Sequence, residues 1–239
     1  MKAVILSGGL GTRLRTIVAD RPKPMAEVQG KPFLEHLIGR LREQGLCELV
    51  LCVGHMADIV SGYFGDGKRW GVRLQYAVET ELRGTAGAVL NARSLLHGPF
   101  LVLNGDSYLD IDLRALVEHH QLQRAEHART LGTIAAVKAE DAAAYGTLEW
   151  DAQGRIKRLG EKASAGAGWI NGGVYVLEAQ LLDLIPAGRA VSIERETFPQ
   201  LLERGYTLHA FPVEGFFADI GTAEGYRRFQ RYVGVNRET

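Results

Sequence analysis

The chain is 239 residues long, with 46% hydrophobic and 23% charged residues, an ordinary composition for a globular protein that buries its core without disulfides. Lysine plus arginine equal aspartate plus glutamate at 28 each, so the net charge gives no reason to expect a nucleic-acid or membrane partner. No apolar run approaches the roughly 18 residues of a membrane span, and the chain opens directly on a core-like strand without a signal peptide. We therefore expect a cytoplasmic protein with a single domain over residues 1–239, and the composition leaves homo-oligomerisation open.

Short apolar runs alternate with helical periodicity along the chain, which is typical of stacked βαβ units. The sequence predicts strands at 3–6, 48–53, 74–77, 100–103, 133–137 and 173–177, and helices at 33–44, 56–64, 87–95, 113–120, 180–185 and 197–204. Residues 146–150 and 155–159 flank a turn and read as a β-hairpin. The fold class that follows is α/β, with a mostly parallel sheet flanked by helices on both faces and antiparallel additions in the second half.

The loop after the first predicted strand is rich in glycine and cations. Gly8, Gly9 and Gly11 let the backbone turn tightly with its N–H groups outward, which makes an anion cradle. Arg13 adds a planar donor fork for phosphate oxygens, and Lys23 is a point charge held between two prolines. A ring of amides with two cations predicts a polyphosphate ligand, and the loop indicates triphosphate chemistry.

Two better-known glycine motifs do not fit this loop. A dinucleotide fingerprint would need a third glycine where Leu14 stands, and a Walker A loop would need Gly-Lys-Ser/Thr where the chain has Gly-Thr-Arg. The remaining alternative is an ordinary strand-to-helix turn with surface cations, and the pairing of Arg13 with Lys23 argues against it.

Cys47 and Cys52 are the two cysteines of the chain. Their C-x4-C spacing has no second cysteine pair, which is a poor pattern for zinc. We therefore interpret both cysteines as packing residues in a reduced protein.

Two carboxylates follow apolar, strand-like runs in distant parts of the chain. Asp106 ends the run Leu-Val-Leu-Asn-Gly-Asp, which places it at the carboxyl edge of a parallel sheet, where open α/β folds bind ligands. Asp219 follows Phe-Phe-Ala in the same way. Two carboxylates from distant segments can hold one Mg²⁺, an ion that prefers oxygen ligands and bridges phosphates.

These pieces, together with others in the same order, resemble the sugar-1-phosphate nucleotidyltransferases. The shared motifs are Gly-Gly-x-Gly-Thr-Arg-Leu at 8–14, Pro-Lys-Pro at 22–24, Leu-x-Gly-Thr-Ala-Gly at 82–87, Asn-Gly-Asp at 104–106, Glu-Lys at 161–162, Asn-Gly-Gly-Val-Tyr at 171–175 and Asp-Ile-Gly-Thr at 219–222. The resemblance spans nearly the whole chain. It implies a Rossmann-like nucleotidyltransferase fold that joins a sugar 1-phosphate to a nucleoside triphosphate and releases pyrophosphate.

The resemblance also implies roles for individual residues. Arg13 would steady the departing β and γ phosphates, Lys23 would neutralise the reacting α phosphate, and Asp106 and Asp219 would hold magnesium. The implied nucleotide-binding residues are Leu6, Ser7, Gly8, Gly9, Gly11, Thr12, Arg13, Lys23, Glu79, Gly84, Thr85, Ala86, Gly87, Asn104 and Gly105. The implied sugar-phosphate-binding residues are Tyr145, Gly146, Glu161, Lys162, Asn171 and Gly172.

The identities of the nucleobase and the sugar are inferred from weaker features of the sequence. Glu79 could accept hydrogen bonds from guanine N1–H and N2–H2, with a solvated loop carboxylate as the alternative. The run Asp20-Arg-Pro-Lys-Pro-Met and Tyr145-Gly-Thr most resemble the D-glycero-α-D-manno-heptose 1-phosphate guanylyltransferases, which make GDP-heptose for surface polysaccharides such as capsules. The expected partners are therefore GTP and that heptose 1-phosphate. Mannose 1-phosphate guanylyltransferase and N-acetylmuramate 1-phosphate uridylyltransferase share most of these motifs and remain alternatives.

Two other classes of protein have to be weighed. Asp110-Ile-Asp112 spells the D-x-D of a metal-dependent glycosyltransferase, but both aspartates are better interpreted as caps of the helix that begins at Leu113. The second of these classes is a non-catalytic sensor of nucleotide sugars. It would have no need of metal-binding and leaving-group charges together.

Overall fold

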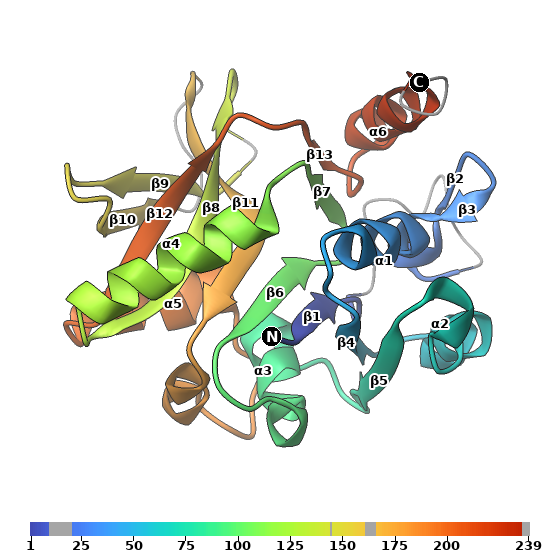
Figure 1. Ribbon diagram of the computed structural model, residues 1–239, viewed down its shortest axis with the longest axis horizontal. Helices are drawn as coiled ribbons and strands as arrows, with labels where there is room; N and C mark the ends of the chain where they lie inside the picture. Colours follow the sequence, from blue (N-terminus) through green and yellow to red (C-terminus); the bar gives the residue numbers. More distant parts are fainter. Residues whose placement is uncertain (10–20, 144, 161–165, 236–239) are drawn as a thin grey trace.

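The computed structural model describes residues 1–9, 21–143, 145–160 and 166–235, which form a mixed α/β structure (Figure 1). The main sheet of the described chain runs in the order β10-β9-β11-β6-β1-β4-β5, and β8 and β12 continue from β11. Its strands are β1 (Ala3–Leu6), β4 (Glu48–Val53), β5 (Arg73–Val78), β6 (Phe100–Asn104), β8 (Thr130–Ala139), β9 (Thr147–Trp150), β10 (Ile156–Gly160), β11 (Gly168–Leu177) and β12 (Thr207–Val213). Two short pairs lie outside it: β2 (Glu27–Val28) with β3 (Lys31–Pro32), and β7 (Ser107–Leu109) with β13 (Phe217–Asp219).

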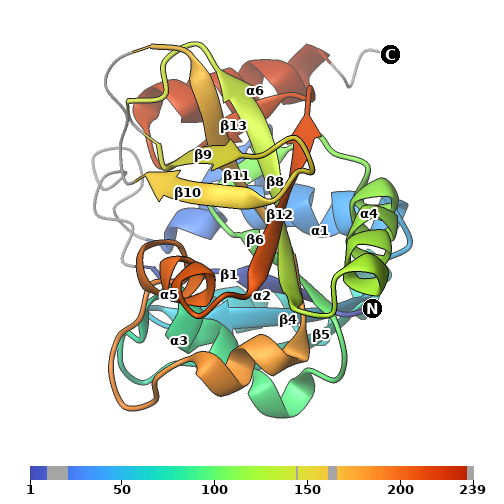
Figure 2. The ribbon, with the colours of Figure 1, turned by 90° about the vertical axis from the view of Figure 1, so that its left-hand side faces the viewer.

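Helices cover both faces of this sheet, as predicted. The α-helices are α1 (Phe33–Glu43), α2 (Ala57–Phe64), α3 (Gly84–Asn91), α4 (Leu113–Glu126), α5 (Phe198–Glu203) and α6 (Ala223–Val235). Short 3₁₀ segments occur at Lys23–Met25, Lys68–Trp70, Arg93–Leu95 and Ala179–Leu184, and Ile193–Thr197 is a π-helical turn just before α5. Figure 2 shows α4 on one side of the sheet, with α3 and α5 on the other.

The alternation of side chains along the central strands creates two cores. Ala3 and Ile5 of β1 pack with α1 and α4 on one face, whereas Val4 packs with α3 and α5 on the other. All three are fully buried. A strand that is buried on both faces has a continuous run of apolar residues in its sequence. Because β1 and β4 are such strands, their observed bounds match the predicted ones.

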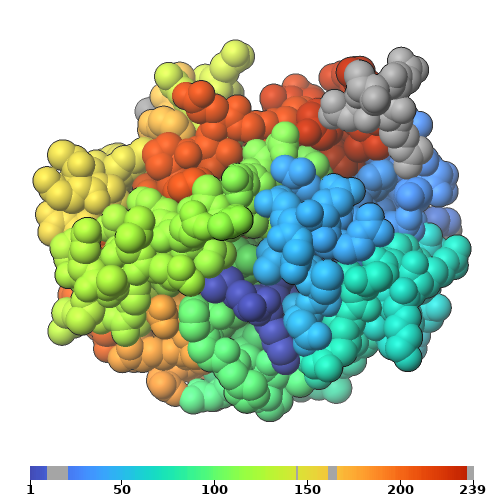
Figure 3. Space-filling model, viewed as in Figure 1, coloured from blue at the N-terminus to red at the C-terminus, as the bar shows by residue number. Residues whose placement is uncertain are grey.

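The order of the parallel strands creates a switch point between β1 and β6. The chain runs from β1 outward to β4 and β5, then returns to place β6 on the other side of β1, with all these pairs parallel. In open α/β sheets, ligands bind in the crevice at the carboxyl ends of the two strands where the order reverses. The space-filling view of Figure 3 shows the first residues, in dark blue, exposed between α4 and α1. The opposite, carboxyl end of β1 is therefore where a ligand site is expected.

The second half of the sheet is largely antiparallel, in agreement with the predicted hairpin. β11 pairs antiparallel with β6, β8 and β9, and β10 pairs antiparallel with β9. β12 pairs parallel with β8 and was not predicted, because His209 and Pro212 interrupt its apolar pattern. Proline is tolerated there because β12 forms an edge of the sheet.

Two expectations from the sequence are wrong. Cys52 is buried as predicted, but Cys47 is exposed and does not pack in the core, since it lies in the short connection just before β4. Asp112 caps α4 by accepting a hydrogen bond from the Ala115 N–H at 3.0 Å. Asp110 does not cap this helix, because its carboxylate accepts hydrogen bonds from Arg40 at 2.5 Å and Tyr232 at 3.1 Å.

Among the described residues, no helix is long and apolar enough to cross a membrane.

Candidate active site

A cavity of about 330 Å³ opens at the switch point between β1 and β6. Its size falls within the range of small-molecule sites. Backbone contacts tie the end of β1 to both neighbouring strands: the Gly105 N–H, just after β6, donates to the Leu6 carbonyl at 2.9 Å, and the Ser7 N–H donates to the Cys52 carbonyl of β4 at 2.8 Å. The cavity is lined by Leu6, Ser7, Gly8, Gly9, Lys23, Pro24, Glu79, Leu82, Gly84, Thr85, Ala88, Asn104, Gly105 and Asp106. Most of the predicted nucleotide-binding residues that the structure describes therefore meet in one place.

Three residues that line this cavity each carry a buried polar side-chain atom with no hydrogen-bond partner within the described part of the chain. These atoms are Ser7 Oγ, Glu79 Oε1 and Asn104 Oδ1. Such groups cost free energy unless something satisfies them, so their gathering in one cavity indicates a polar ligand. Burial raises the pKa of the Glu79 carboxyl, although the backbone N–H and the charge of Arg83 oppose this effect.

Glycines in the cavity wall allow a close backbone approach. A Cβ atom on Gly105 would lie 2.5 Å from the Leu6 carbonyl oxygen, and one on Gly8 would lie 2.6 Å from Glu79 Oε2. Real Cβ atoms essentially never come that close to other heavy atoms. Glycine is therefore required at Gly105, where the neighbour is backbone, whereas a Cβ at Gly8 would force the Glu79 side chain to shift.

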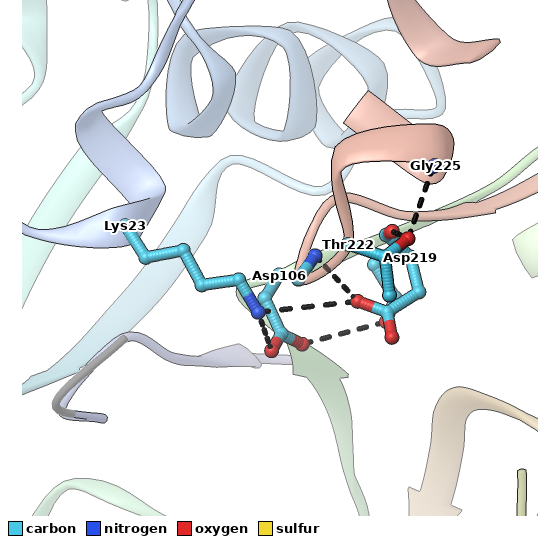
Figure 4. Close-up of polar contacts among 7 residues, drawn as sticks. Lys23, Asp106, Asp219, Thr222 and Gly225 are labelled. Atoms are coloured by element: carbon cyan, nitrogen blue, oxygen red, sulfur yellow. Dashed lines mark hydrogen bonds and ion pairs between the residues drawn. The ribbon is translucent and has the colours of Figure 1, made fainter. Parts of the chain in front are cut away.

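Lys23, Asp106 and Asp219 converge at one edge of the cavity (Figure 4). The Lys23 Nζ atom lies 2.6 Å from Asp106 Oδ2 and 3.9 Å from Asp219 Oδ1. The lysine and Asp219 side chains are only 9% and 15% exposed, whereas that of Asp106 is 39% exposed. The most open member of the group thus faces the side from which a ligand would arrive.

The pairing of β7 with β13 brings the two aspartates together. Asp219 lies opposite Ser107 in this pair, and the Ile220 N–H donates to the Asp106 carbonyl at 2.9 Å. The Asp219 carboxylate accepts the Gly221 N–H at 2.7 Å, and the Thr222 hydroxyl donates to the Asp219 carbonyl oxygen at 3.3 Å. These contacts fix the orientation of Asp219.

Two carboxylates that share one ammonium group leave an excess negative charge. This donor set fits a hard divalent cation, which takes carboxylate oxygens together with phosphate oxygens and water. Within the described ranges, no group of three or more histidine, cysteine or acidic side chains could hold a metal ion. A cation at Asp106 and Asp219 would thus depend on the ligand for its remaining bonds.

The segment expected to pack against a nucleobase forms the start of α3. Gly84 and Thr85 line the cavity, but Ala86 and Gly87 are buried behind it and do not line it. Three lining residues were not predicted: Pro24, Leu82 and Ala88. Leu82 is 52% exposed at the cavity wall, so it offers an apolar surface to a flat ring.

The described residues of the predicted sugar side lie next to the two aspartates without lining the cavity. The Asn171 N–H donates to the Gly146 carbonyl at 2.9 Å, and a Cβ on Gly172 would lie 3.0 Å from Leu109 of β7. The Tyr145 ring contacts the Phe217 ring of β13, with centroids 5.7 Å apart. The remaining predicted residues, Gly11, Thr12, Arg13, Glu161 and Lys162, lie outside the described residues.

The family model for nucleotidyl transferases matches residues 2–234. The chain belongs to this nucleotidyl transferase family. A D-glycero-alpha-D-manno-heptose 1-phosphate guanylyltransferase of Campylobacter jejuni is 34% identical over 232 residues, covering 96% of this chain and 98% of that protein. A mannose-1-phosphate guanylyltransferase of Mycobacterium tuberculosis is 35% identical over 229 residues, which cover 95% of this chain but only 62% of that protein.

Solved structures of this family share the fold. HddC from Yersinia pseudotuberculosis superposes with a TM-score of 0.85 at 30% identity, over 97% of this chain and 99% of that one. A second structure of the same protein, complexed with GMP-PN, gives a TM-score of 0.83 over the same shares of both chains. The α/β nucleotidyltransferase fold predicted from the motifs is confirmed.

Proposed function

We propose that this nucleotidyl transferase moves a guanylyl group from GTP to a sugar 1-phosphate, with D-glycero-α-D-manno-heptose 1-phosphate as the preferred acceptor. The convergence of Lys23, Asp106 and Asp219 on the edge of a cavity with unpartnered polar atoms carries this proposal. The relative from Campylobacter jejuni, which matches this chain over nearly its whole length, supports the heptose acceptor. The product would be a GDP-sugar for surface polysaccharide synthesis.

The reaction is an in-line displacement at phosphorus. A phosphate oxygen of the sugar 1-phosphate forms a bond to the α phosphorus of GTP, and the bond from that phosphorus to the bridging oxygen of pyrophosphate breaks. The nucleophile is already ionised, so no general base is needed. Positioning and charge neutralisation are then the main contributions of the protein.

Lys23 would neutralise the reacting phosphate. Its ammonium carries more than one N–H donor, so it can keep its bond to Asp106 and still donate to a phosphate oxygen. Because its side chain is only 9% exposed, its charge is poorly screened by water. Arg13, which follows β1 in the sequence, would stabilise the departing pyrophosphate.

Asp106 and Asp219 would hold Mg²⁺. The ion would draw the triphosphate and the sugar phosphate together and offset their mutual repulsion. Asp219 is held by the Gly221 N–H, which leaves Asp106 as the more exposed and adjustable carboxylate.

Glu79 supports guanine as the base. Its side chain is 9% exposed and its Oε1 atom lacks a partner within the described chain, so a ligand with adjacent N–H donors would satisfy it. Guanine offers N1–H and N2–H2 together, whereas uracil offers a single N–H and adenine only the amino group. The carboxylate thus favours GTP over UTP and ATP.

The decisive experiment is a substrate matrix read by pyrophosphate release. The four nucleoside triphosphates are each tested with heptose, mannose, glucose and N-acetylmuramate 1-phosphates. GTP with the heptose 1-phosphate is expected to be best, with mannose 1-phosphate weaker by about 10- to 200-fold, because it lacks one hydroxymethylene group. A preference for UTP with an N-acetylated sugar phosphate would reject the guanylyl assignment and leave nucleotidyl transfer intact. Absence of pyrophosphate in every combination would reject the enzyme.

A further inference from the structure

The start of α3, on the base side of the cavity, is held by a segment from a distant part of the chain. The Val191 N–H donates to the Arg83 carbonyl at 2.8 Å, and the Ala86 N–H donates to the Val191 carbonyl at 3.0 Å. Gly84 has a positive φ of +69°, and a Cβ there would overlap the Val191 backbone. The segment 191–197 therefore packs against the first turn of α3 and hydrogen-bonds to it through Val191.

One carboxylate in this segment bonds directly to the cavity wall. Glu194 Oε2 accepts hydrogen bonds from the Thr85 hydroxyl at 2.8 Å and the Ser192 hydroxyl at 3.0 Å. The Thr85 oxygen in turn accepts the Ile193 N–H at 2.8 Å. Because Thr85 lines the cavity, Glu194 determines the position of a wall that it does not itself form.

The other oxygen of the same carboxylate reaches the central sheet. Glu194 Oε1 accepts a hydrogen bond from the hydroxyl of Tyr175, a fully buried residue of β11, at 3.3 Å. Burial raises the pKa of Tyr175 well above its usual value, and the Glu194 charge raises it further. The phenol therefore keeps its proton and donates a hydrogen bond to Glu194. The side-chain amides of Asn104 and Asn171 lie close to this phenol and oppose the rise in its pKa.

The chain of contacts thus runs from the base side of the cavity to the sugar side. Asn104 lines the cavity two residues before Asp106, and Asn171 is a predicted sugar-binding residue. Glu194 itself lies in the π-helical turn Ile193–Thr197. Such turns are rare and are frequently found at functional sites.

We propose that Glu194 is a positioning residue that holds the base side of the cavity, at Thr85, in register with the sugar side, at Tyr175. The inference rests on the proposed function, because it assigns the two ends of the contact chain to the two substrates. One carboxylate serves both sides, so its loss affects the use of both substrates. Removing one end of the chain affects mainly one of them.

The test compares Glu194→Ala, Glu194→Gln, Thr85→Val and Tyr175→Phe with the wild-type chain. Glu194→Ala is expected to lower kcat/KM by about 10- to 100-fold through higher KM values for both GTP and the sugar phosphate, since hydrogen bonds to a charged group are lost. Glu194→Gln keeps one acceptor oxygen without the charge and replaces the other with an NH2 donor, so it should recover only part of this loss. Thr85→Val should raise mainly the KM for GTP, and Tyr175→Phe mainly that for the sugar phosphate.

Glu178→Gln is the matched control. Glu178 is also a part-buried carboxylate bonded to other side chains, at 3.1 Å from His120, but it follows the end of β11 that is remote from the cavity. This variant should lose thermal stability while both KM values stay unchanged. A Glu194→Ala variant that loses stability but keeps both KM values within about twofold of wild type would reduce Glu194 to a structural role and overturn the proposal.

A binding measurement separates this inference from the proposed function. If the wild-type chain turns over no substrate pair, the proposed function fails, and the affinity for GTP with Mg²⁺ is then measured by calorimetry. Weaker GTP binding in Glu194→Ala and Thr85→Val, with no change in Glu178→Gln, would support the positioning role. Unchanged GTP binding in Glu194→Ala would overturn it.

Discussion

At the scale of single residues, the cluster at the cavity edge combines three charges that would be unfavourable separately. The Lys23 ammonium offsets part of the repulsion between Asp106 and Asp219, and it lies within 4 Å of both. A divalent cation would offset the remaining negative charge of the two carboxylates and could take phosphate oxygens as further ligands. The two aspartates can be tested by removing their charge without changing their shape.

Asp106→Asn and Asp219→Asn should each lower turnover by about 10²- to 10³-fold while leaving the fold intact, because an amide is a poor ligand for a hard cation. Steady-state rates across a magnesium titration provide the measurement, with circular dichroism as a check on folding. Asp110→Asn is the control, since that carboxylate is bonded to Arg40 and Tyr232. Near-normal turnover of either site variant at low magnesium would contradict the two-carboxylate site.

The two cations should differ in their kinetic effects. Lys23→Ala is expected to lower kcat, because Lys23 would act at the reacting phosphorus, whereas Arg13→Ala should mainly impair the use of the triphosphate. Initial rates with each substrate varied in turn separate kcat from KM. Equal effects confined to KM in both variants would show that both cations only bind.

Glu79→Gln should reduce the preference for GTP. The amide presents a donor as well as an acceptor, so it can no longer accept both guanine N–H groups, and kcat/KM with GTP should fall about 10- to 100-fold. Rates with ATP and UTP should change much less. Glu81→Gln, two residues away and exposed, is the control and should keep the wild-type preference. A Glu79→Gln variant with unaltered selectivity would remove this residue from base recognition.

At the scale of elements, the sequence predicts those strands and helices that are determined by neighbouring residues in the chain. β1 and β4 are continuous apolar runs with the predicted bounds, and the helix at Leu113 is correctly placed because Asp112 caps it. β12 was missed because an edge strand tolerates the proline that breaks its pattern.

The site could be predicted as far as its residues lie in motifs. Ser7, Asn104 and Gly105 come from the ends of predicted strands, and the structure brings them to one cavity. Leu82 opens the motif at 82–87, but the motif does not reveal that its side chain lines the cavity, and Ala88 of α3 lies just outside any motif. The bond between Thr85 and Glu194 joins residues 109 positions apart, so it depends on tertiary packing.

Gly84→Ala should destabilise the start of α3. Alanine at a φ of +69° costs about 1 to 2 kcal/mol, and overlap with the Val191 backbone adds about 1 to 3 kcal/mol to the loss of unfolding free energy. Urea unfolding measures this loss. Gly188→Ala is the matched control, because Gly188 has a φ of +79° with open space around its Cβ position. Equal losses in the two variants would show that the Val191 contact is unimportant.

At the scale of the whole molecule, a group of histidines between α4 and the sheet predicts how stability depends on pH. His209 of β12 is fully buried, and burial, followed by the neighbouring histidines and Arg155, lowers its pKa to about 4. Its pKa in the unfolded chain is near 6.5, so the unfolded state takes up a proton first as the pH falls. The contribution of neutral, buried His209 to the free energy of unfolding is therefore fully present above pH 6.5 and is lost as the pH falls toward about 4.

The free energy of unfolding should accordingly decrease between pH 6.5 and about 4, and His209→Gln should make this decrease shallower. Urea unfolding at several pH values provides the measurement. His97→Gln, which changes an exposed histidine, should keep the wild-type slope. An unchanged slope in the His209 variant would assign the acid sensitivity to other groups.

The pairing of β7 with β13 also sets the order in which the molecule can mature. Asp106 belongs to the first half of the chain, but its partner Asp219 lies in a strand near the C-terminal end. During synthesis Asp106 leaves the ribosome well before Asp219, and a domain generally folds as a unit. A nascent chain that has not yet reached β13 therefore lacks the second carboxylate of the site. It would acquire the complete charge cluster only when synthesis is almost finished.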